Sequence, residues 1–123
     1  MEGLTRWGPA VLWAAVIFAL SSIPGRSFPE IAGVAGVDKL AHMGVFAVFG
    51  FLVARAVGGG SARAFLVAAA VASAYGALDE FHQLFTPGRD ASVWDFAADT
   101  LGGAVGAAAR LYLARRRADV DHP

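Results

Sequence analysis

The stretch AFLVAAAVASAYGALDEF, residues 64–81, combines a long apolar run with two adjacent acids near its end, Asp79 and Glu80. Residues 64–72 are all Ala, Phe, Leu or Val, so a helix formed there is apolar on every side. Such a helix is buried in lipid or in the core of a large protein, and about 20 residues are enough to cross a bilayer. The stretch therefore predicts a transmembrane helix that carries two carboxyl groups at one end.

Three further segments of similar length and composition accompany it, at residues 7–23, 40–57 and 93–113. Hydrophobic residues make up 57% of the chain and charged residues 16%, whereas about 25% charged residues is usual in soluble domains. We therefore expect an all-α polytopic membrane protein, a four-transmembrane-helix bundle made of two helical hairpins that the flexible residues 58–61 connect. Four spans and their loops use nearly all 123 residues, so residues 1–123 should form one domain with a short cytoplasmic tail at 114–123.

Basic residues are distributed unevenly over the expected loops and tails. Seven of the ten lie on the side that holds both termini and the 58–61 connection: Arg6, Arg55, Arg63, Arg110, Arg115, Arg116 and Arg117. The other three, Arg26, Lys39 and Arg89, lie on the opposite side. Because Lys and Arg are enriched in cytoplasmic loops, this distribution predicts a multi-pass protein with both termini in the cytoplasm.

Acidic side chains gather at the outward ends of the expected helices: Asp38, Asp79, Glu80, Asp95 and Asp99. Ionisable groups at membrane depth are costly, so they indicate a functional site by default. Ala68, Ala72 and Gly76 recur every four positions in the quoted stretch, and Glu80 follows at the same spacing. Small residues on one face let another helix approach, so Glu80 on that face should point toward a neighbouring helix. Asp95 and Asp99 share one helix face by the same spacing. Asp38 lies one turn from His42, so we expect three helices to bring carboxylates and an imidazole to the same depth.

Several short motifs occur in a fixed order along the chain: Ser21-Ser22 with Pro24, Asp38-Lys39 followed by His42, Glu80 followed by Gln83, Arg89, Asp95, and Leu101-Gly102 with Gly106. Together they resemble the VanZ-like family of small bacterial integral membrane proteins, which is named for a determinant of teicoplanin resistance. The resemblance implies a protein of the bacterial cell membrane with a role in the cell envelope and a link to antibiotic resistance, but no defined reaction. One position departs from the family pattern, because Asp99 stands where the family usually has Asn.

Two residues are candidates for acid-base catalysis. Glu80 could act as a general base, and His42 could be its partner or a proton shuttle. The candidates for ligand binding are other polar residues at this end: Asp38, Lys39, Gln83, Arg89, Asp95 and Asp99. Arg89 could hold a phosphate or carboxylate through a bidentate contact, or it could pair with a neighbouring acid to close its loop, and the sequence does not distinguish the two.

A divalent metal is a further candidate for this group of side chains. The imidazole of His42 and the carboxylates of Asp38, Glu80, Asp95 and Asp99 would supply hard oxygen ligands with one nitrogen. The chain has no cysteine and no HExxH motif, so the familiar spacings of zinc sites are absent. The sequence therefore assigns no metal ligands and leaves the cofactor open.

Three classes of function stay open. The first is binding of an amphiphilic or lipid-linked envelope molecule at an outward-facing polar site, with an effect on susceptibility to teicoplanin-type glycopeptides. The second is an intramembrane hydrolase or transferase that acts on a lipid-linked or phosphorylated substrate, with Glu80 and His42 as its acid-base pair. The third is a structural or partner-binding bundle, although interhelical polar contacts contribute on average only about 0.6 kcal/mol. The expected partners are membrane lipids and such an amphiphile, with no nucleic acid, and oligomerisation stays open.

Overall fold

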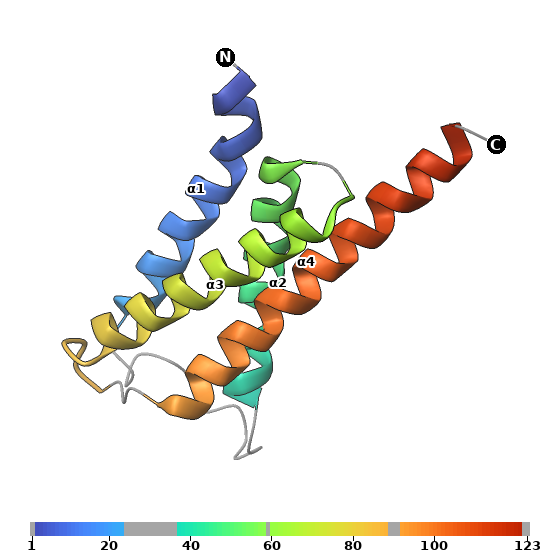
Figure 1. The fold of residues 1–123 in the computed structure, drawn as a ribbon. Helices are drawn as coiled ribbons and strands as arrows, with labels where there is room; N and C mark the ends of the chain where they lie inside the picture. The colour runs from blue at the N-terminus through green and yellow to red at the C-terminus, as the bar shows by residue number, and fades with distance from the viewer. Residues whose placement is uncertain (1, 24–36, 59, 89–91, 122–123) are drawn as a thin grey trace.

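The computed structural model describes residues 2–23, 37–58, 60–88 and 92–121, and of residues 37–39 it describes the backbone. The described residues form four helices, α1 (Glu2–Ser21), α2 (Val37–Val57), α3 (Ala62–Gln83) and α4 (Val93–Asp121). The start of α1, the end of α2, the start of α3 and the end of α4 lie at one end of the bundle (Figure 1). No strand occurs within these ranges, which confirms the all-α prediction.

Three of the four helices are long and apolar enough to cross a membrane: Glu2–Ser21, Leu40–Val57 and Ala62–Gln83. By length and composition, these three helices are candidates for three of the four expected spans. The fourth helix, α4, is the least apolar, because it carries Asp95 and Asp99 near its start and several arginines in its second half. By composition alone it does not qualify as a span.

Two helix boundaries differ by five residues or more from those expected from the sequence, at the start of α1 and the end of α4. Helix α1 begins at Glu2, five residues before the expected start, and an acid in the first turn favours this because it faces the positive end of the helix dipole. Helix α4 continues to Asp121, so most of the expected tail at 114–123 is helical. Residues 114–118 are only Ala and Arg, which are strong helix formers, and no Gly or Pro interrupts them.

Helix α2 is the centre of the bundle and packs against each of the other three helices. Its most extensive partner is α4, followed by α3 and α1, while α1 and α4 do not pack together within the described ranges. The strongest contact therefore joins the two expected hairpins rather than lying inside either of them. Figure 1 shows α4 passing obliquely across α2.

Glycines on both helices allow α2 and α4 to approach closely. A Cβ atom on Gly106 would overlap the backbone of Ala47, and one on Gly102 would overlap the backbone of Met43. Gly50 meets Gly103 in the same way. In a membrane, an apolar side chain is as stable against lipid as against another helix, so burial of apolar surface does not drive helices together. Small residues favour helix association there because they let the two backbones pack closely. Gly102 and Gly106 are four residues apart, so they share the face of α4 that packs on α2.

This packing leads to a prediction about stability. Gly106→Ala should lower the free energy of unfolding by about 1–3 kcal/mol, because the added methyl group forces α2 and α4 apart. Gly44→Ala is the matched control, since nothing lies within 4 Å of a Cβ at that position of α2. Alanine is the better helix former, so the control should be neutral or up to about 1 kcal/mol more stable. Unfolding in mixed detergent micelles measures both, and equal stability of the two variants would contradict this account of the interface.

Arginines hold the helix ends together on the side of the termini. Arg6 donates two hydrogen bonds to the Ala56 carbonyl (3.0 and 2.6 Å) and one to Val57 (3.0 Å), which satisfies carbonyls left free at the end of α2. Arg115 donates to the Gly60 carbonyl at 3.0 Å. Arg6 and Arg115 thus lie at the same end of the bundle, as the charge pattern predicted. The side of the membrane on which that end lies stays a prediction.

Candidate functional site

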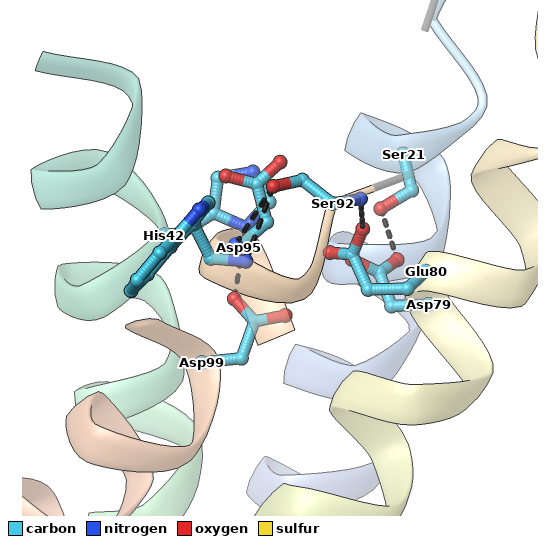
Figure 2. Close-up of polar contacts among 8 residues, drawn as sticks. Ser21, His42, Asp79, Glu80, Ser92, Asp95 and Asp99 are labelled. Atoms are coloured by element: carbon cyan, nitrogen blue, oxygen red, sulfur yellow. Dashed lines mark hydrogen bonds and ion pairs between the residues drawn. The ribbon is translucent and has the colours of Figure 1, made fainter. Parts of the chain in front are cut away.

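Buried acids gather at the opposite end of the bundle, where α2, α3 and α4 converge. We call His42, Asp79, Glu80, Asp95 and Asp99 the polar cluster; all four acids in it are less than 9% exposed. Figure 2 shows these side chains together with Ser21 and Ser92, which come from α1 and from the residue before α4. Three different helices therefore supply the cluster, as the helix spacing predicted.

Asp99 is the most deeply buried member of the cluster, with no exposed surface. Its Oδ1 lies 2.8 Å from Nδ1 of His42 on α2 (Figure 2). Gly76 on α3 makes room for this side chain, because a Cβ there would lie only 3.0 Å from the Cβ of Asp99. The other carboxylate oxygen, Oδ2, is buried and has no hydrogen-bond partner. Asp99 thus lies at the middle of the site, between α2 and α3.

Glu80 faces the bundle, as the small-residue stripe predicted, since Ala68, Ala72, Gly76 and Glu80 are all buried. Its Oε2 accepts a hydrogen bond from the backbone N–H of Ser92 at 3.1 Å. The Ser92 hydroxyl in turn accepts from the backbone N–H groups of Trp94 and Asp95, so Ser92 caps the start of α4. Glu80 therefore links the end of α3 to the start of α4. Its Oε1 is buried without a partner.

Asp79 is a member of the cluster that the sequence prediction did not include among the site residues. The Ser21 hydroxyl at the end of α1 donates a hydrogen bond to Asp79 Oδ1, and both residues are buried. The hydroxyl of Thr86 also donates to the Ser21 carbonyl at 3.2 Å. Adjacent residues on a helix point about 100° apart, so Asp79 lies off the stripe of Glu80. Ser21 in the Ser21-Ser22 motif was the signal that could have identified it.

Four residues of the cluster are close enough to act on one group. His42, Asp79, Glu80 and Asp99 each offer one nitrogen or oxygen atom, and these atoms all lie within 4.8 Å of one another. Glu80 and His42, the expected acid-base pair, are therefore neighbours in space. The hydrogen bond of His42, however, is to Asp99. The arrangement can orient an imidazole with a carboxylate, hold a cation, or exchange protons with a bound polar group.

The remaining predicted ligand-binding residues divide into two groups. Gln83 and Asp95 are buried at this end of the bundle. The side chains of Asp38 and Lys39, and all of Arg89, lie outside the described residues. The backbone of Asp38 and Lys39 belongs to the first turn of α2, one turn before His42. His82 lies at the edge of the site, where its ring stacks on Phe18 and its Nε2 is 3.0 Å from the Ser22 hydroxyl.

Large apolar side chains are exposed at the end of α3, just beyond it and at the start of α4, close in sequence to Glu80 and Asp95. Phe81, Leu84, Phe85, Val93 and Trp94 are each more than 60% exposed. Exposed apolar patches of this kind indicate contact with a membrane or with an apolar ligand. A polar site bordered by such residues suits a molecule that has both a charged and an apolar part.

A family model described as VanZ/LLP1 matches residues 7–114, which cover all four helices except the first turns of α1 and the last turns of α4. Neither the curated proteins nor the solved structures contain a match to the chain.

Proposed function

The chain belongs to the VanZ/LLP1 family, and on the geometry of its polar cluster we propose that it binds the headgroup of an amphiphilic or lipid-linked molecule of the cell envelope. One observation carries the proposal: Glu80 Oε1 and Asp99 Oδ2 are buried carboxylate oxygens with no hydrogen-bond partner. Buried polar atoms are nearly always paired in folded proteins. Oxygens left in this state at membrane depth are well suited to accept hydrogen bonds from a bound group.

The surroundings of the cluster favour an amphiphile over a water-soluble ligand. Phe81, Phe85 and Trp94 are exposed beside the cluster and would lie among lipid acyl chains. A ligand with an acyl tail could therefore keep its tail in the membrane while its headgroup reaches Glu80. Lipid-linked envelope precursors and lipoglycopeptides have this architecture. Binding of the latter would link the protein to teicoplanin-type susceptibility.

The proposal includes α4 as a fourth membrane span. The acids that reduce its apolar character lie against α2 and α3, so they would not face lipid. With the arginine-rich end in the cytoplasm, both termini are cytoplasmic and the polar cluster opens to the outside of the cell. An envelope precursor in the outer leaflet could then reach the cluster directly.

This orientation predicts the labelling of cysteines at the two ends of α3. The chain has no cysteine, so single substitutions give a clean signal. Pro87→Cys, at an exposed position beyond α3, should react with a membrane-impermeant maleimide in intact cells. Ala62→Cys, at the exposed start of α3, should react only after the cells are lysed. The reverse pattern would contradict both the orientation and an outward-facing site.

A second candidate function is an intramembrane hydrolase or transferase. It is favoured by the contact between His42 and Asp99, because a carboxylate that holds an imidazole in one orientation is a recurrent part of acid-base catalysis. Glu80 lies close by as the second acid or base. The substrate would be the same class of lipid-linked or phosphorylated molecule, so one experiment tests both functions.

The experiment is a titration of the purified protein in detergent with three ligands: an acylated lipoglycopeptide, its deacylated analogue, and an undecaprenyl phosphate lipid. Binding that requires the acyl chain and leaves the ligand unchanged supports the binding function. Release of phosphate or of a headgroup supports the enzyme. If a well-folded sample binds none of the three, the structural or partner-binding role becomes the better account.

A further inference from the structure

We propose that His42, Asp79, Glu80 and Asp99 form a binding site for a divalent transition-metal cation, Mn²⁺ or Zn²⁺. The sequence assigned no metal ligands because it contains no local metal-binding motif. The four residues come from three helices, so their proximity exists only in the folded bundle. The inference deepens the proposed function, since a cation here could hold a phosphate headgroup, and it rests on the same polar cluster.

The distances among the side chains fit a single ion. One nitrogen or oxygen from each of the four residues lies within 4.8 Å of the others. Ligand atoms that each lie about 2.1 Å from a zinc ion are roughly 3–4 Å apart, so rotations of the side chains are enough to close the site. Four ligands from the protein also match the usual coordination number of zinc, and a larger coordination sphere would leave positions for a headgroup oxygen.

Two buried oxygens indicate that a partner is missing. Asp99 Oδ2 belongs to a residue with no exposed surface, and Glu80 Oε1 belongs to one that is 8% exposed; neither atom has a hydrogen-bond partner. Leaving such atoms unpaired away from water is costly, whereas a bound cation satisfies both at once. This observation is independent of the grouping of the acids.

The charge of the cluster points in the same direction. Three of its four proposed ligands are carboxylates, and His42 is the one basic side chain that the structure describes among them. The described arginines lie toward the other end of the bundle or on the distal half of α4. Acids buried together are stabilised when a cation neutralises them, and a metal ion is the largest charge such a site can hold.

Neighbouring groups hold two of the ligands in place. The Ser21 hydroxyl donates to Asp79, and the backbone N–H of Ser92 donates to Glu80. Hydrogen bonds of this kind orient the ligands of metal sites and strengthen binding. The single imidazole nitrogen favours Mn²⁺ or Zn²⁺ over Mg²⁺ and Ca²⁺, which prefer oxygen ligands throughout.

The test measures metal content and affinity without any lipid. Protein stripped with a chelator and incubated with Mn²⁺ or Zn²⁺ should retain about one ion per chain after gel filtration, and bound Mn²⁺ should lose the electron paramagnetic resonance signal of the aqueous ion. His42→Gln and Asp99→Asn should each weaken binding by at least about tenfold, since losing even a group that orients a ligand costs about 10- to 100-fold. Asp119→Asn makes the same chemical change at an exposed position of α4 and should leave affinity unchanged.

Retention of no ion by the wild-type protein would overturn the proposal, as would equal affinities of Asp99→Asn and Asp119→Asn. Circular dichroism and gel filtration verify that each variant is folded. If Asp99→Asn does not fold, the metal affinities of Glu80→Gln and Glu2→Gln are compared instead. Equal affinities of these two variants would also overturn the proposal. The proposed function fails separately: metal retention with no lipid binding contradicts the lipid proposal alone, and lipid binding by protein that retains no metal contradicts the metal proposal alone.

Discussion

Replacing Glu80 by glutamine should remove most ligand binding while the fold stays intact. Binding to the acyl-chain ligand should weaken by about 10- to 100-fold, because a hydrogen bond to a charged group contributes about 1.5–3 kcal/mol. The amide oxygen of glutamine can still accept the hydrogen bond from the Ser92 backbone N–H, so the link between α3 and α4 is retained. Titration of wild-type and Glu80→Gln protein with the ligand measures the effect.

The stability of the same variant distinguishes a site from a scaffold. A buried carboxylate that serves function costs stability, so in the presence of a chelator Glu80→Gln should melt at the same temperature as the wild type or higher. A carboxylate that serves only to hold the helices together would instead lower the melting temperature when replaced. Glu2→Gln, at an exposed residue of the other end, is the matched control: it should leave ligand binding unchanged and lower the melting temperature only slightly, because it weakens the dipole interaction at the start of α1. If Glu80→Gln binds the ligand as tightly as the wild type does, Glu80 is not a ligand-binding residue.

The sequence predicted the helices because each is a long apolar segment, and it predicted the direction of Glu80 because small residues recur every four positions. Such patterns depend only on residues that are close in sequence, so they can be recognised in a single amino-acid sequence. The far end of α4 was less predictable, because charged residues such as Arg115 and Arg117 are typical of both a tail and an exposed helix. Between a tail and an exposed helix, the high helix propensity of Ala and Arg favours the helix.

The pairings within the site were not predictable in the same way. His42 and Asp99 are 57 residues apart, and the contact between them depends on the rotation of α2 against α4. Gly102 and Gly106 allow α4 to approach α2 closely, but nothing in the sequence identified α2 as the helix that packs there. The end of the bundle at which the acids lie was therefore predictable from the sequence, whereas their hydrogen-bond partners depend on how the helices pack.

The contact between His42 and Asp99 should make the largest contribution to stability of any polar pair in the described bundle. In the presence of a chelator, Asp99→Ala should lower the free energy of unfolding by about 3 kcal/mol, because it removes one partner of a buried pair. His42→Ala leaves the fully buried Asp99 carboxylate without its hydrogen bond and should cost a similar amount. Unfolding in mixed detergent micelles measures both variants.

The double variant tests whether these costs come from the pair itself. Removing both residues should cost about 1–3 kcal/mol less than the sum of the single changes, since the second change no longer strands a buried group. Ser73 and Thr100 provide a matched control, because their hydroxyls form a 3.2 Å hydrogen bond between α3 and α4 one residue beyond Asp99. Ordinary interhelical contacts of this kind couple by about 0.6 kcal/mol. If the His42–Asp99 coupling is no larger than that of Ser73 and Thr100, the polar cluster is held no more tightly than ordinary helix packing requires, and His42 is not oriented for chemistry.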